Sequence, residues 1–187
     1  MKVGESDLQR LTLAMENKNW SIEEVIKFIE NGPIRSQKII DTASDIKLNI
    51  DYTKTIEQAV ADGKYDWKNS DVTTKNFPVP LKMTGKKVEV SVKLFHFNRD
   101  ISSEDAISKM DKAGYRPATL MELLALGFLF PELQRQFPIV ALGSVWRVAN
   151  LDLYAPGLFV GGHKRGLDLR WIVSGWRARY RFLGVHK

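Results

Sequence analysis

The stretch GLDLRW, residues 166–171, decides the fold prediction because it places a large apolar residue at every second position. Successive side chains of a β-strand point to opposite faces, so the odd-numbered residues are predicted to be buried and the even-numbered ones exposed. The stretch RARYRF, residues 177–182, repeats this pattern with alanine, tyrosine and phenylalanine inside and three arginines outside. Both stretches therefore predict strands with one apolar face and one wet face of mixed chemistry.

Two interpretations of the wet face are open. It could be an ordinary solvent-exposed side of a sheet, or it could be a surface that binds a ligand. Like charges that alternate along one strand face repel each other, and an anionic partner would relieve that repulsion. Arginine also pairs with carboxylates and phosphates, and it is enriched at binding hot spots together with tryptophan and tyrosine.

The pattern on either side of these stretches indicates an α+β chain. Apolar alternation predicts a strand over 86–97, and cap residues predict helices over 102–113 and 119–127. Earlier in the chain, helical spacing predicts helices over 7–17, 21–31 and 55–61, and Pro131 favours a further short one. The other predicted strands cover residues 139–147, 153–160, 166–173 and 177–185. A strand, then helices, then a run of strands is typical of the α+β class.

The net charge of +6 in a chain of 187 residues is concentrated at one end. Residues 144–187 contain eight Lys or Arg and two Asp or Glu, whereas the rest of the chain is balanced. A basic segment with tryptophans favours nucleic acid or an acidic partner, and a solvated arginine-rich face is the alternative. There is no signal-peptide pattern and no run of 18 apolar residues, so we expect no membrane span. The expected location is the cytoplasm, or a cell or virion surface reached without a signal peptide.

Several stretches resemble a known family. They are FNRDISSEDA (97–106), GYRPAT (114–119), FPIVALGSVWR (137–147) and YRFLGV (180–185). They resemble the variable proteins of diversity-generating retroelements, which occur in phages, bacteria and archaea and in which a reverse transcriptase introduces errors at adenines of a copied repeat. The resemblance covers about residues 50–187, with a variable region at about 144–187, and residues 1–49 are expected to be a helical N-terminal extension. It implies a C-type-lectin fold related to the formylglycine-generating enzymes.

The resemblance also implies which residues vary and which form a fixed scaffold. The implied ligand-contact residues are Val148, Asn150, Asp152, Tyr154, Phe159, Gly161, Gly166, Asp168, Arg170, Ser174, Arg177 and Arg179. The implied scaffold residues are Trp146, Pro156, Leu167, Leu169, Trp171, Trp176, Ala178, Tyr180 and Phe182. Mutation of the two adenines of an asparagine codon never yields Lys, Glu, Gln, Met or Trp, and none of the twelve contact residues is of these types. The two leucines at 151 and 153 depart from the family pattern, in which small or polar residues are usual.

The residues needed for several chemistries are missing from the sequence. The chain has no cysteine, which excludes disulfides, thiolate metal sites and the copper chemistry of the formylglycine-generating enzymes. The calcium-binding triplets of sugar-binding lectins do not occur, and the three histidines lack metal-ligand spacing. The acidic residues at 100, 104 and 105 are explained by helix capping, and Trp67 is interpreted as a core or interface residue.

These observations predict a non-catalytic, calcium-independent ligand-binding protein with no cofactor, no catalytic residue and no metal site. The expected partner is a macromolecule, with a protein favoured. A basic nucleic-acid-binding module is the first alternative. A self-associating protein, whose arginine-rich sheet docks on its own acidic helical half, is the second, so an oligomer is also open.

Overall fold

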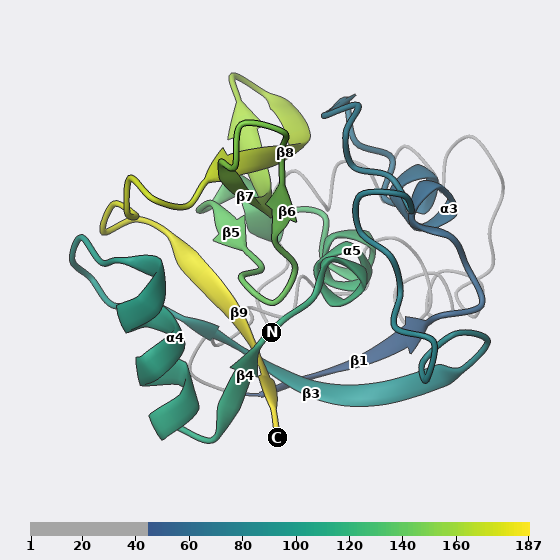
Figure 1. Ribbon diagram of the computed structural model, residues 1–187, viewed down its shortest axis with the longest axis horizontal. Helices are drawn as coiled ribbons and strands as arrows, with labels where there is room; N and C mark the ends of the chain where they lie inside the picture. The colour runs from purple at the N-terminus through teal and green to yellow at the C-terminus, as the bar shows by residue number, and fades with distance from the viewer. Residues whose placement is uncertain (1–44) are drawn as a thin grey trace, which may run out of the picture. The chain divides into compact units, whose positions relative to one another are not determined.

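The computed structural model describes residues 45–187, which form a mixed α+β unit built around one large sheet (Figure 1). The helices are α3 (Ile56–Asp62), α4 (Ser103–Lys112), α5 (Leu120–Leu129) and the 3-10 helix η1 (Leu133–Arg135). The strands are β1 (Ile46–Asp51), β2 (Trp67–Lys68), β3 (Lys87–Phe95), β4 (Tyr115–Pro117), β5 (Ile139–Val140), β6 (Trp146–Arg147), β7 (Leu153–Gly161), β8 (Lys164–Trp171) and β9 (Arg181–His186). The predicted α+β class is confirmed at this level. The predicted helices over 7–17 and 21–31 lie outside the described residues.

The sheet joins segments that are far apart in the sequence. Its strand order is β1-β3-β9-β5-β7-β8-β2, with β4 paired to β9 and β6 paired to β7. Strand β3 is antiparallel to the C-terminal strand β9, and β7 and β8 form a long antiparallel hairpin. Strand β1 begins at Ile46, so the last residues of the predicted N-terminal extension, 46–49, belong to the sheet.

Local capping explains where the helices begin. The Ser102 hydroxyl accepts a hydrogen bond from the Asp105 amide at 3.1 Å, which starts α4 as the sequence predicts. Thr119 and Glu122 form the predicted capping box of α5. Helix α5 continues to Leu129, past its predicted end at Gly127. This glycine does not end the helix; it allows close packing, because a Cβ there would collide with the Tyr65 hydroxyl.

The core lies on both sides of the β7–β8 hairpin. On one side, the buried leucines of α5 pack near Leu158 of β7, and Leu167 of β8 is fully buried. On the other side, Trp176, Phe182 and Met110 belong to a second apolar cluster, which joins α4 to β9. Strand β7 has apolar neighbours on both faces. All its residues from Ala155 to Phe159 are therefore buried, on both sides of the strand.

Two strand predictions need correction. The predicted strand over 139–147 is divided into β5 and β6, and residues 177–180 form a turn before β9 begins at Arg181. The turn follows Gly175, whose φ of +72° suits glycine, and it is closed by the Tyr180 amide donating to the Arg177 carbonyl at 3.0 Å. The predicted row of three arginines on one strand face is therefore wrong.

Two predicted inward residues are also exposed. Trp171 is 45% exposed because β8 ends there. Ile107, predicted to face inward on α4, is 37% exposed.

No helix among the described residues is long and apolar enough to cross a membrane.

Candidate ligand-binding surface

The twelve predicted contact residues lie in three segments at the C-terminal end of the fold. The loop between β6 and β7 and the start of β7 carry Val148, Asn150, Asp152 and Tyr154. The β7–β8 hairpin carries Phe159, Gly161, Gly166, Asp168 and Arg170. The segment between β8 and β9 carries Ser174, Arg177 and Arg179. Of the twelve, only Phe159 is buried.

The second segment forms a surface on β8 that we call the β8 face, made of Gly166, Asp168 and Arg170. The strand register places Gly166 opposite Phe159 on β7, so all four residues share one side of the hairpin. The Arg170 guanidinium lies 4.5 Å from the centre of the Phe159 ring and 3.3 Å from the Asp168 carboxylate. These contacts hold Arg170 over the hairpin while its side chain stays 48% exposed.

Phe159 is the one predicted contact residue that is buried. It is only 8% exposed, and its ring packs edge-on to Tyr180 at 6.2 Å and beneath Arg170. It belongs to the same apolar cluster as Trp176 and Phe182. The alternation along β7 correctly places it on the side of Gly166, but that side of β7 is covered by the turn before β9.

Strand β2 extends the β8 face with two residues that the sequence prediction missed. β2 runs parallel to β8, with Trp67 beside Gly166, and the Trp67 side chain is 51% exposed. The Asn69 amide donates to Asp168 at 3.2 Å. A Cβ at position 166 would lie 3.5 Å from the Trp67 ring, which is ordinary contact, so this glycine can be replaced without a clash.

Main-chain hydrogen bonds hold the turn that carries Arg177. The Asp100 carboxylate accepts from the Ala178 amide at 3.0 Å and from the Arg177 guanidinium at 2.9 Å. The main chains of Ile101 and Trp176 exchange two hydrogen bonds of 3.0 and 2.8 Å. Asp100 thus has a role beyond the helix capping expected from the sequence, since it fixes a turn 77 residues away.

A cavity of about 440 Å³ lies between this turn and the start of α4. Its lining includes Asp100, Ser102, Asp105, Ser174 and Arg177. Two of these residues are predicted contact residues and three belong to the segment predicted to be constant. The cavity therefore brings together side chains from the predicted variable region and from the segment before it.

An aromatic row crosses the other end of the β7–β8 hairpin. Tyr154 on β7 is in register with Trp146 on β6 and with Trp171 on β8. Residues directly opposite each other in antiparallel strands point to the same side, and the rings of Trp146 and Tyr154 are 6.3 Å apart. The row is only partly covered, since Trp171 is 45% exposed.

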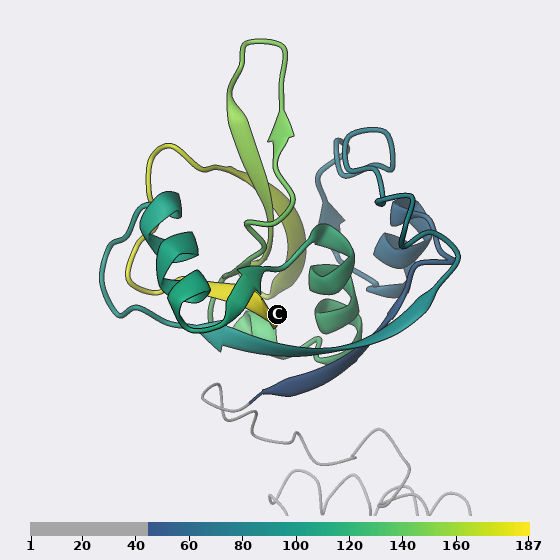
Figure 2. The same cartoon turned by 60° about the horizontal axis from the view of Figure 1, so that its bottom comes forward.

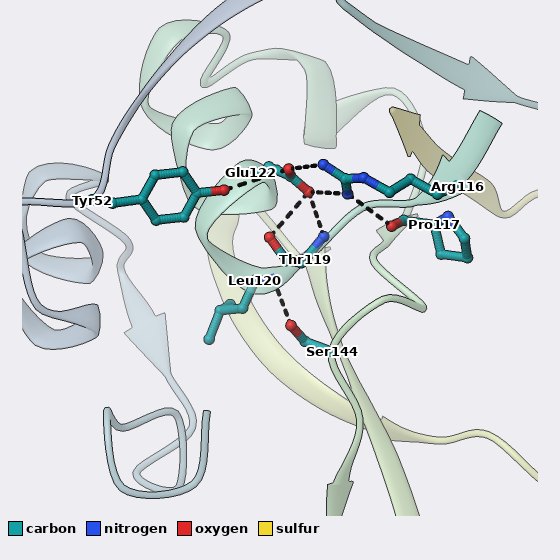
Figure 3. Close-up of polar contacts among 7 residues, drawn as sticks. All are labelled: Tyr52, Arg116, Pro117, Thr119, Leu120, Glu122 and Ser144. Atoms are coloured by element: carbon teal, nitrogen blue, oxygen red, sulfur yellow. Dashed lines mark hydrogen bonds and ion pairs between the residues drawn. The ribbon is translucent and has the colours of Figure 1, made fainter. Parts of the chain in front are cut away.

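A buried polar network lies apart from this surface, at the start of α5 (Figure 3). Glu122 is fully buried, and its carboxylate accepts from Arg116 at 2.6 and 3.0 Å and from the Thr119 amide at 2.6 Å. The Tyr52 hydroxyl lies 3.5 Å from the same carboxylate, and burial together with the nearby Glu122 charge raises the pKa of Tyr52 to about 12. The Ser144 hydroxyl accepts from the Leu120 amide at 2.9 Å. Each oxygen of Glu122 is engaged by neighbours, which fits a structural role in fixing α5.

Within residues 45–187 no three His, Asp or Glu side chains form a group that could hold a metal ion. His96, one of the three histidines, has its ring nitrogen 3.0 Å from the Ala178 carbonyl, so it contacts the turn before β9. Comparison of the chain with protein-family models, with curated proteins and with solved structures finds no match.

Proposed function

We propose that residues 50–187 are a C-type-lectin-like domain of a non-catalytic protein that binds a macromolecular ligand through a diversified surface. The fold supports this proposal in outline. Strand β3 is followed by two helices, α4 and α5, and then by the strands that end in β9, which pairs with β3. Strand β9 therefore lies between β3 and β5, so the last strand joins the early part of the sheet to the later part, as we would expect of a C-type-lectin fold.

The observation that carries the proposal is the different exposure of the two predicted residue sets. Eleven of the twelve contact residues are exposed or half-buried, whereas five of the nine scaffold residues are buried. On β8 the two sets alternate, with Leu167 and Leu169 buried between Gly166, Asp168 and Arg170. A surface arranged in this way can change sequence while the residues beneath it keep the fold.

Hydrogen bonds between side chains outside the predicted variable region and the main chain of this surface further support a surface that tolerates substitution. The buried Gln134 side chain donates to the carbonyls of Phe159 and Gly166 at 2.6 and 3.1 Å, which ties β7 to β8. Asp100 likewise binds the Ala178 amide. At residues 159, 166 and 178 these contacts use only the main chain, so they remain when the side chains there change, proline at 178 excepted.

Two randomised libraries would test the proposal. The contact library varies Gly166, Asp168, Arg170, Arg177 and Arg179. The scaffold library varies Leu167, Leu169, Trp176, Ala178 and Phe182. We expect the fraction of folded members, measured by protease resistance on the yeast surface, to be on the order of tenfold greater in the contact library. Equal survival of the two libraries would contradict the proposal.

A protein ligand is favoured over nucleic acid because much of the local positive charge is already neutralised or buried. Arg170 and Arg177 pair with Asp168 and Asp100, and Arg165 is only 7% exposed. We therefore expect random-sequence DNA or RNA to bind no more tightly than about 1 μM at physiological salt. Filter binding at two salt concentrations measures this. Submicromolar binding that weakens steeply with salt would instead support the nucleic-acid-binding alternative.

A further inference from the structure

Strand β1 forms an open edge of the large sheet. Among residues 45–187 its only strand neighbour is β3, and it lies at the opposite end of the strand order from β8 and β2. Figure 2 shows β1 at the bottom of the described part and the loop between β6 and β7 at the top. An edge strand presents main-chain N–H and C=O groups that can pair with another strand. These groups and the exposed side chains of β1 therefore decide what can pair with it.

The main-chain groups that face the open edge belong to alternate residues of β1. The Tyr52 amide, directly after β1, donates to the Lys86 carbonyl at 2.8 Å, which continues the register of β1 with β3. Alternate residues of an antiparallel pair direct their main chain toward the partner strand, and the residues between them direct it away. The outward residues of β1 are therefore Lys47, Asn49 and Asp51.

The charges of these three residues are arranged symmetrically about Asn49, with Lys47 two residues before it and Asp51 two residues after it. In an antiparallel pair of two β1 strands with a twofold axis at Asn49, Lys47 of each copy lies opposite Asp51 of the other. A pair centred on Lys47 or on Asp51 would instead place like charges opposite each other. Because opposite charges stabilise such a pair and like charges destabilise it, β1 favours a second copy of itself in this register.

Strand β3 extends this charge pattern on both sides. The Lys47 ammonium lies 2.7 Å from the Glu89 carboxylate, and the Lys87 ammonium lies 3.6 Å from the Asp51 carboxylate. Across the joined sheets the row would contain Glu89 and Lys47 of one copy, followed by Asp51 and Lys87 of the other. Negative and positive groups alternate along the whole row. A strand of an unrelated protein would match it only if it carried the same charge order.

Exposed apolar side chains of α5 lie beside the same edge. A cavity of about 320 Å³ is lined by Asn49 and Ile50 of β1 and by Leu124, Phe128 and Leu129 of α5. Phe128 is 54% exposed and Leu129 is 46% exposed. A twofold axis perpendicular to the joined sheet keeps α5 of both copies on the same side. These side chains would then lie beside the second copy, which removes apolar surface from water.

We propose that the chain forms a twofold-symmetric dimer in which the β1 strands of two copies pair antiparallel about Asn49. The inference goes beyond the proposed function and does not depend on it. It also differs from the self-association expected from the arginine-rich sheet, because β1 and α5 lie outside residues 144–187. Since β1 and β8 are separated in the strand order, such a dimer leaves both β8 faces open and presents two of them to one target.

Sedimentation equilibrium of the full chain tests the dimer. We expect a monomer–dimer equilibrium, and Asn49→Pro should raise its Kd at least about tenfold. Proline removes the central outward amide and no β1–β3 hydrogen bond, because this amide points away from β3. Asn49→Ala is the matched control, since it keeps the amide and should dimerise like the parent. A chain that stays monomeric up to about 100 μM, or a dimer that Asn49→Pro leaves unchanged, would overturn the proposal.

Exchange of charges tests the register, and it decides the question even if Asn49→Pro does not fold. Lys47→Glu places a second carboxylate opposite Asp51, and Asp51→Lys places a second ammonium opposite Lys47, so each homodimer should weaken about tenfold. An equimolar mixture of the two variants restores opposite charges in both pairs. Native mass spectrometry should then show the heterodimer as the main dimer. Heterodimers no more abundant than chance mixing gives would overturn the pairing about Asn49.

Discussion

Glu122→Ala should lower the free energy of unfolding by about 3 kcal/mol or more. The substitution removes the only carboxylate that contacts Arg116 among the described residues and leaves the Thr119 amide without its acceptor at the start of α5. The Tyr52 hydroxyl would lose a neighbour as well. Urea unfolding followed by tryptophan fluorescence measures the change.

Glu104→Ala is the matched control for this prediction. Glu104 is also a glutamate in the first turn of a helix, but it is exposed on α4. Its replacement should change the free energy of unfolding by no more than about 0.5 kcal/mol. Similar losses in the two variants would show that the buried network does not anchor α5.

Phe182→Ala should destabilise the protein by about 3 to 5 kcal/mol, whereas Arg179→Ala should leave its stability within about 0.5 kcal/mol. Phe182 is 1% exposed, and its ring packs against Trp176 at 5.8 Å and Phe97 at 5.6 Å. Arg179 is exposed, and its guanidinium lies 5.9 Å from the Tyr180 ring. Thermal melting of both variants tests whether scaffold and contact positions differ energetically.

Trp171→Ala refines the same comparison. The alternation in residues 166–171 predicts a core tryptophan, with a loss as large as that of Phe182. Since Trp171 is 45% exposed, its replacement should cost clearly less than that of Phe182. Equal losses for Trp171 and Phe182 would mean that the end of β8 is more deeply covered than the structure indicates.

The parts of the fold that depend on local chemistry could be predicted from the sequence. Ser102 starts α4, and Thr119 with Glu122 starts α5, because a cap needs only residues within one turn. The strand β3 was predictable for a similar reason, since Val92 and Leu94 are buried on one side. These elements require no knowledge of what packs on them.

The parts that depend on distant neighbours could not be predicted. Alternation gives the side of a strand on which Phe159 lies, but the turn that covers it is set by tertiary packing. The alternation of β8 places Trp171 on the apolar side of the strand, as predicted. Trp171 is nevertheless exposed because the strand ends there. Trp67 and Asn69 reach the β8 face through a parallel pairing with a strand about a hundred residues away, and nothing near them in sequence indicates that partner.

The hydrogen bond from Ala178 to Asp100 has a consequence for how such a protein can evolve. If the proposed diversification is confined to about residues 144–187, Asp100 lies outside it and keeps its carboxylate, and every residue type except proline supplies the amide at 178. New side chains at 177 and 179 could then be selected for another target without compensating substitutions elsewhere. Adaptation to a new target would then change the binding contacts without changing the hydrogen bonds that hold the turn.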